Sequence, residues 1–161
     1  MINKMKIIPL LFIGLLLNGF YLYAGGSLEG DPNEISDYYK NQIETGKMKP
    51  LISMETTDKG KYDIITNYLP ENENIEDYYY RIIITVILDE RRKKDFTPEE
   101  YNESKEMPEY KDKKIEYIEY AIWYYENFFN KYRGTAGDPT GKCFSVIFDE
   151  NYAVKGKVPW K

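Results

Sequence analysis

Three glutamates and one tryptophan are the side chains of this sequence whose types and spacing best fit a chemical role. Glu116, Glu119 and Glu126 lie seven, four and three residues from Trp123, so all four would share one face of a helix. Two carboxylates about 5–9.5 Å apart suffice for glycoside hydrolysis, and an aromatic ring beside them can stack on a sugar. A carboxylate-dependent glycan hydrolase is therefore one hypothesis, although glutamates at such spacing more often form a solvated helix face.

Other catalytic chemistry is restricted, because the sequence contains no histidine and a single cysteine, Cys143. These counts exclude histidine-based nucleophile pairs, histidine-ligated zinc or haem, and multi-cysteine metal sites. Segment 136–143, AGDPTGKC, shares Gly141 and Lys142 with phosphate-binding loops but lacks the glycine and the Ser or Thr that such loops need at its two ends. We therefore expect no cofactor and no metal, and an enzyme is the less favoured class.

The tryptophan and the glutamates belong to segment 110–133, which we predict to be a long central helix. Its apolar residues recur at steps of three and four, which is typical of one broad apolar helix face: Ile115, Ile118, Ile122, Tyr125, Phe129 and Tyr132. The segment ends on basic residues followed by Gly134, as a helix C-terminus favours. Trp123 would then project from the opposite, polar face.

Trp123 is the residue that we expect to matter most if the protein binds a partner. One account makes it a second core contact, covered by the C-terminal hairpin or by segment 47–60. The other makes it an exposed anchor ringed by polar groups, which is the composition of an interface hot spot. The predicted binding residues are Trp123, Tyr120, Glu116 and Glu119.

Segment 72–94 supports two interpretations. It contains no Gly or Pro, begins acidic and ends basic, which favours a helix aligned with its dipole. Its centre, residues 82–87, is six consecutive β-branched residues, which favours a strand. We predict a helix, because 23 residues without a break are long for a strand. In either form the segment should pack against 110–133.

Local signals mark the remaining elements. Residues 97–100, Thr-Pro-Glu-Glu, are the clearest helix start, a capping box with proline at the first helical position. Residues 47–60 are expected to be mostly connection, and 143–154 a β-hairpin at a sheet edge. The other predicted helices are 31–46, 61–69 and 97–107. The predicted fold class is mainly α (α+β), a small helical domain of about four to five helices with a C-terminal β-hairpin.

The first 26 residues carry the features of a secretory signal peptide. Two lysines precede an uninterrupted apolar run over 7–17, and small residues follow at 24–26. Cleavage after residue 26 would leave a single α-rich domain, 27–161, that begins at Ser27 and is secreted or periplasmic. The alternative is an uncleaved anchor, which is disfavoured because about 20 apolar residues are needed to span a bilayer.

Charge and composition favour a binding function. Residues 27–161 carry 20 basic and 27 acidic side chains, a net charge of −7, so nucleic acid and anionic membrane surfaces are disfavoured as partners. They also contain fifteen tyrosines, a residue favoured at interfaces. We expect an exported, non-catalytic domain that binds a macromolecular partner or cell-envelope component and meets the membrane only through its signal peptide. A structural dimer linked through Cys143 is a further alternative, although such a cysteine is more often a buried, unreactive thiol.

Overall fold

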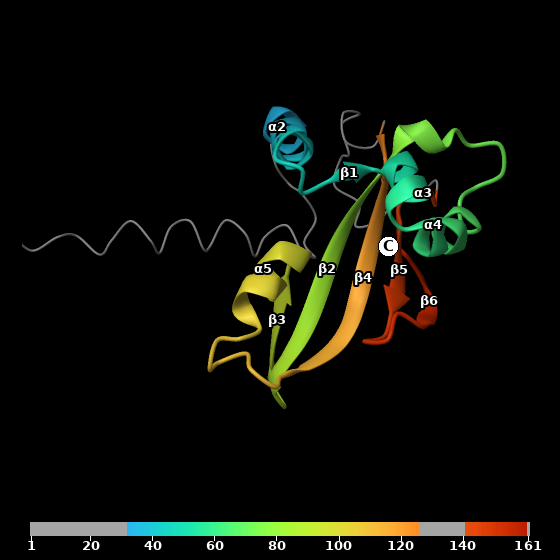
Figure 1. Cartoon of the computed structure of the whole chain (residues 1–161). Coiled ribbons are helices and arrows are strands. Elements are labelled where there is room, and N and C mark those ends of the chain that lie inside the picture. Colours follow the sequence, from blue (N-terminus) through green and yellow to red (C-terminus); the bar gives the residue numbers. More distant parts are fainter. Residues whose placement is uncertain (1–31, 126–140, 161) are drawn as a thin grey trace, which may run out of the picture.

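The computed structural model describes residues 32–125 and 141–160, which are organised around one antiparallel β-sheet (Figure 1). The strands in this part of the chain are β1 (Lys49–Pro50), β2 (Tyr78–Asp89), β3 (Arg92–Phe96), β4 (Lys114–Tyr124), β5 (Phe144–Phe148) and β6 (Val154–Pro159). The helical elements are α2 (Pro32–Glu44), η1 (Leu51–Ser53), α3 (Met54–Thr57), α4 (Lys59–Thr66), η2 (Ile75–Asp77) and α5 (Pro98–Ser104). The prediction of a mainly α, helical domain is therefore wrong. The predicted signal peptide and Ser27 lie outside the described residues.

One side of the sheet, the core face, carries the hydrophobic core. The strand order is β1-β2-β4-β5-β6, with β3 also paired to β2. The register places Tyr80, Ile122 and Phe144 in one row across β2, β4 and β5, and each of them is at most 6% exposed. Leu51 of η1 and Ile65 of α4 are buried in the same cluster. The core is therefore closed between the sheet and the segment from η1 to α4.

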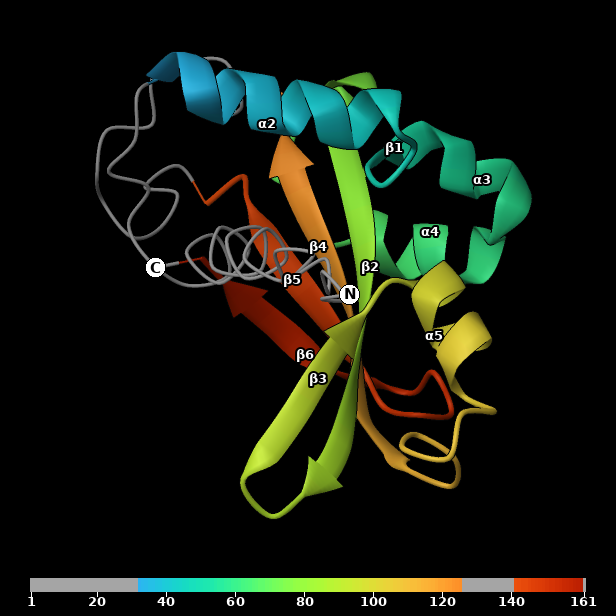
Figure 2. The same cartoon turned by 90° about the vertical axis from the view of Figure 1, so that its left-hand side faces the viewer.

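The other side of the sheet we call the Trp123 face. Side chains alternate across a strand, so the residues between the core positions belong to it: Arg81, Ile83 and Thr85 of β2; Tyr117, Glu119, Ala121 and Trp123 of β4; Ser145 and Ile147 of β5. Figure 2 shows α2 running across the ends of β2 and β4 on this side, with α5 beside β2, whereas Figure 1 shows α3 and α4 on the opposite side of the sheet. The Trp123 face is thus crossed at one end by α2.

The predicted central helix is wrong over residues 114–124, which form β4. Most of this stretch is isoleucine or aromatic, so its apolar residues satisfy a helical and an alternating pattern equally well. Such residues pack better on a pleated surface than along a helix. Both faces of β4 are covered near its end, where residues 120–124 are all buried. The rest of the predicted helix, 126–133, lies outside the described residues.

The prediction of a helix over 72–94 is also wrong, and the competing strand interpretation is confirmed, because the segment forms β2 and β3. The β-branched run at 82–87 prevails over the helix-like charge pattern. The turn between the strands needs neither Gly nor Pro, since the Oδ1 atom of Asp89 accepts hydrogen bonds from the backbone N–H groups of Arg91 and Arg92 at 3.0 and 3.1 Å. The expected packing against 110–133 is confirmed as the pairing of β2 with β4.

Several locally encoded elements are confirmed. α5 begins with the predicted capping box, in which the Thr97 backbone N–H donates to Glu100 Oε2 at 2.8 Å and the Glu100 N–H donates to Thr97 Oγ1 at 3.2 Å. α2 and α4 overlap the helices predicted at 31–46 and 61–69. The β5–β6 hairpin is present, and β6 ends the described sheet.

Segment 47–60 differs from the expected connection, because it contains β1, η1 and α3. Met48, Leu51 and Met54 are each at most 2% exposed, so burial of three large side chains orders this stretch. Within the described residues, no helix combines the length and apolar character needed to cross a membrane.

Candidate functional site

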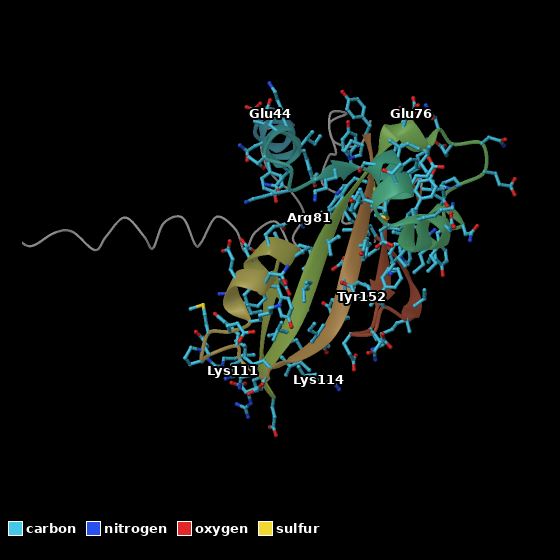
Figure 3. All side chains as sticks on the ribbon, in the orientation of Figure 1. Glu44, Glu76, Arg81, Lys111, Lys114 and Tyr152 are labelled. Atoms are coloured by element: carbon cyan, nitrogen blue, oxygen red, sulfur yellow. The ribbon has the colours of Figure 1, made fainter. Side chains whose placement is uncertain are left out.

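Trp123 is enclosed by side chains from three other elements. The ring of Tyr39 on α2 lies 6.3 Å from it between centroids, and Trp160, just after β6, meets it edge-on at 4.7 Å. Arg81, labelled in Figure 3, lies on β2. Its guanidinium carbon is 5.3 Å from the centroid of the Trp123 ring, a cation–π arrangement. Trp123 is 5% exposed. This agrees with the account of a second core contact, and the C-terminal hairpin contributes to its cover as that account expects.

A chain of hydrogen bonds leads from this aromatic cluster to a carboxylate. The indole N–H of Trp160 donates to Ser145 Oγ at 3.1 Å, and the Ser145 hydroxyl donates to Glu119 Oε1 at 2.5 Å. Ser145 is 3% exposed, so its hydroxyl is satisfied by protein groups on both sides. These two hydrogen bonds hold the Glu119 carboxylate in a fixed orientation on the Trp123 face.

The end of the face under α2 is also polar. Arg81 Nη1 donates to the Tyr38 hydroxyl at 3.4 Å. Burial raises the pKa of Tyr39 to about 12, with a further contribution from Tyr38, against the opposing effects of a hydrogen bond with Trp123 and the charge of Arg81. The Tyr39 hydroxyl therefore remains protonated through the physiological range. The guanidinium of Arg81 thus lies between the Trp123 ring and the Tyr38 hydroxyl.

The four predicted binding residues do not form one cluster. Glu119 and Trp123 share the Trp123 face, whereas Tyr120 belongs to the core face, is 3% exposed and stacks at 6.3 Å on Tyr80. Burial raises the pKa of Tyr120 strongly. Glu116 lies at the irregularity between β2 and β4, where its carboxylate accepts from Lys93 Nζ at 2.7 Å. Steps of three and four gather residues on a helix but divide them between the faces of a strand.

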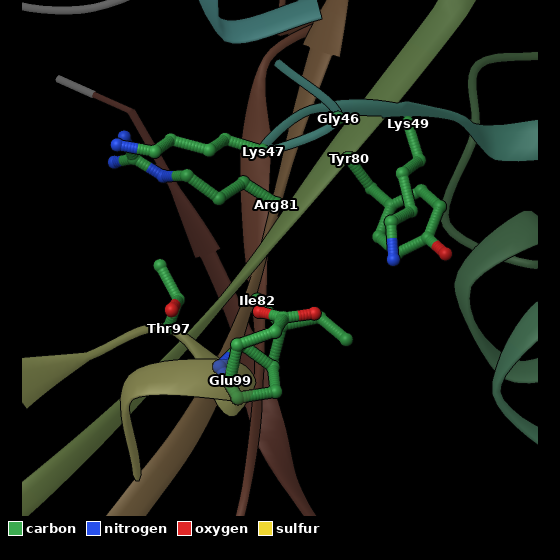
Figure 4. A pocket seen from close by; sticks show the side chains of 9 residues that line it. Gly46, Lys47, Lys49, Tyr80, Arg81, Ile82, Thr97 and Glu99 are labelled. Atoms are coloured by element: carbon green, nitrogen blue, oxygen red, sulfur yellow. The ribbon is translucent and has the colours of Figure 1, made fainter. Parts of the chain in front are cut away.

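The hydrolase hypothesis requires two carboxylates across a cleft. A cavity lies at the edge of β2 and is lined by Arg81, Lys47, Lys49 and Glu99, so it contains one carboxylate (Figure 4). Glu119 and Glu116 do not line it. Within the described residues, no three His, Cys, Asp or Glu side chains are grouped as a metal site would need. The lining of this cavity therefore contains one of the two carboxylates that the hydrolase hypothesis requires.

The residues that sequence analysis missed are Arg81, Tyr39, Ser145 and Trp160, which reach Trp123 or Glu119 from distant parts of the chain. The strand register brings Arg81 and Ser145 to this face, and a helical interpretation of 110–133 hides that register. Tyr39 comes from α2, and Trp160 follows the end of β6. No known protein family, curated protein or solved structure matches this chain significantly.

Proposed function

We propose that this protein is an exported, non-catalytic domain that binds a macromolecular partner of the cell envelope through its Trp123 face. The observation that supports this best is a row of side chains across three strands: Ile83, Glu119 and Ile147 are register neighbours on β2, β4 and β5. Export is supported by the signal-like charge, apolar run and small residues of 1–26.

The row has the composition of an interface rather than of an ordinary solvated sheet surface. Antiparallel sheets that face water normally carry polar residues at the outward positions. Here Ile83 and Ile147 are half-buried and lie outside the hydrophobic core, and Tyr117 is half-buried beside them on β4. An apolar centre with one oriented carboxylate gives a partner both contact area and a fixed polar contact.

Two alternatives have weaker support. A glycan hydrolase would need a second carboxylate facing Glu119, and the nearest register neighbours of Glu119 are isoleucines. A disulfide-linked dimer would need an accessible thiol, whereas Cys143 is 2% exposed and its sulfur accepts from the Tyr124 backbone N–H at 3.5 Å. The predicted burial of this thiol is confirmed.

Site-specific photo-crosslinking tests the proposed surface. A photoreactive phenylalanine analogue replaces Tyr117 on the Trp123 face, and a matched variant carries it at Glu103, an exposed position on α5. In the cells that produce the protein, the Tyr117 position should give one dominant adduct and the Glu103 position should not. Equal adduct patterns from both positions, or none from Tyr117, would refute the proposal.

A further inference from the structure

The edge of β2 contains a gap between its two neighbours. β1 pairs with Tyr79 and Tyr80, and β3 pairs from Ile84 onward, so residues 81–83 have no strand partner on this edge within the described residues. Backbone groups of a strand alternate between its two neighbours. At least one of the three residues therefore presents its N–H and C=O to the gap, where the cavity of Figure 4 lies.

The charged residues that line this cavity are mainly cationic. Lys47, Lys49 and Arg81 line it together with Glu99, a net charge of +2. None of these four side chains forms an ion pair with another described residue. In Figure 4 the side chains of Lys47 and Arg81 run alongside each other and end close together. Two neighbouring cations that form no ion pair with a described residue favour the entry of an anion.

Arg81 is held in place before any ligand arrives. Its guanidinium packs on Trp123 and donates to Tyr38, as described above. Its Nε–H is buried and has no hydrogen-bond partner among the described residues. A buried donor of this kind calls for an occupant such as a water or an ion. A preorganised guanidinium is also suited to planar carboxylates.

We propose that this gap, the edge cavity, binds a single carboxylate group. The cavity has a volume of about 30 Å³, which admits one small group and not a sugar ring. Glu99 disfavours a doubly charged anion, because its carboxylate would face the second negative charge. Arg81 belongs both to the edge cavity and to the Trp123 face, whereas Ile83, Glu119 and Ile147 do not line the cavity, so the two proposals can be tested separately.

Titration of the purified protein with acetate, followed by ¹H–¹⁵N NMR at constant ionic strength, tests the proposal. Acetate should shift the signals of the Arg81 Nε–H and the Ile82 amide saturably, and N-acetylglutamate amide should do the same. Lys47→Gln should weaken acetate binding about two- to fivefold, and Glu99→Gln should strengthen it by a similar factor. Lys47 is exposed, so its substitution leaves the fold intact.

Lys111→Gln, which removes an exposed cation at the far end of the molecule, serves as the matched control and should leave acetate binding unchanged (Figure 3). Inorganic phosphate should bind less tightly than acetate. The proposal is overturned if the two signals do not saturate, if phosphate binds more tightly, or if Glu99→Gln weakens acetate binding as Lys47→Gln does.

Discussion

The two faces of the sheet use the same strands in different ways. On the core face, Tyr80, Ile122 and Phe144 are buried against η1 and α4. On the Trp123 face, the ring of Trp123 packs on a guanidinium at the end under α2, and the buried Thr85 donates to Asp95 of β3 nearer the other end. Between these two places, isoleucines flank an oriented carboxylate. Alternation along one strand therefore separates the residues of the core face from those of the Trp123 face, through which we propose that the protein binds a partner.

The comparison explains why exposure alone does not locate a function here. Trp123 is buried as deeply as other core residues, yet the guanidinium of Arg81 packs on its ring beside the rings of Tyr39 and Trp160, and a core seldom contains such a charge. Substitutions on the two faces should therefore differ in what they damage. Substitutions on the core face should mainly lower the stability of the fold. Substitutions in the middle of the Trp123 face should mainly weaken partner binding.

The largest loss of stability is expected on the core face, for Phe148→Ala. Phe148 is fully buried and meets Tyr120 edge-on at 5.1 Å. Removing its ring leaves a cavity between sheet and helices, so the free energy of unfolding should fall by about 3–5 kcal/mol in urea denaturation. A loss below about 1 kcal/mol would show that this face is not the core that we describe.

Trp123→Ala should cost slightly less, about 3 kcal/mol, because one side of its ring faces a guanidinium that can rehydrate. The variant should also shift the fluorescence of Trp160, which loses its edge-on neighbour at 4.7 Å. Urea denaturation followed by tyrosine circular dichroism measures the first effect without depending on the deleted chromophore. An unchanged unfolding midpoint together with unchanged Trp160 emission would contradict the enclosed cluster.

Some elements of the fold are encoded by residues close together in the sequence, and others are not. The Thr97 capping box and the β5–β6 hairpin could be predicted, because their signals lie within a few residues of each other. β4 could not be, since its nearly continuous apolar run fits both periods. Segment 72–94 favours a helix because it contains no Gly or Pro, yet the Asp89 side chain builds the turn between β2 and β3 without either residue.

The candidate site was predicted only in part for the same reason. Trp123 and Glu119 do share a face, because a step of four preserves the side of a strand as well as of a helix. Tyr120, three residues from Trp123, falls on the other face. Arg81 and Trp160 lie beside Trp123 because strands that are distant in the sequence pair with one another. Periodicity within one segment does not reveal such pairing.

Alkaline pH should weaken the α2 end of the Trp123 face. The folded pKa of Tyr39 is raised from 10.0 to about 12, so the unfolded chain loses this proton first. The protonated Tyr39 hydroxyl contributes fully to the free energy of unfolding below pH 10. This contribution, about 2–3 kcal/mol, is lost as the pH rises toward 12. Tyr39→Phe should remove that part of the alkaline loss.

Tyr152→Phe is the matched control for this experiment, because Tyr152 is 45% exposed. Urea denaturation at a series of pH values compares both variants with the unmodified protein. Equal slopes for the two variants above pH 10 would mean that Tyr39 is not protected by burial.

The smallest effect on stability, and the largest on binding, is expected for Ile147→Thr in the middle of the Trp123 face. Thr keeps the β-branched shape but introduces a hydroxyl at a half-buried position, so the free energy of unfolding should change by about 0.5 kcal/mol or less. Val154→Thr on β6, where the valine is 42% exposed and paired with Phe148, is the matched control outside this face.

The most direct test of the account measures both variants in the protein that carries the photoreactive group at Tyr117. Ile147→Thr should reduce the yield of the dominant adduct several-fold while the unfolding midpoint stays unchanged, and Val154→Thr should alter neither. The account is contradicted if Ile147→Thr leaves the adduct yield intact, or if Val154→Thr lowers the yield equally.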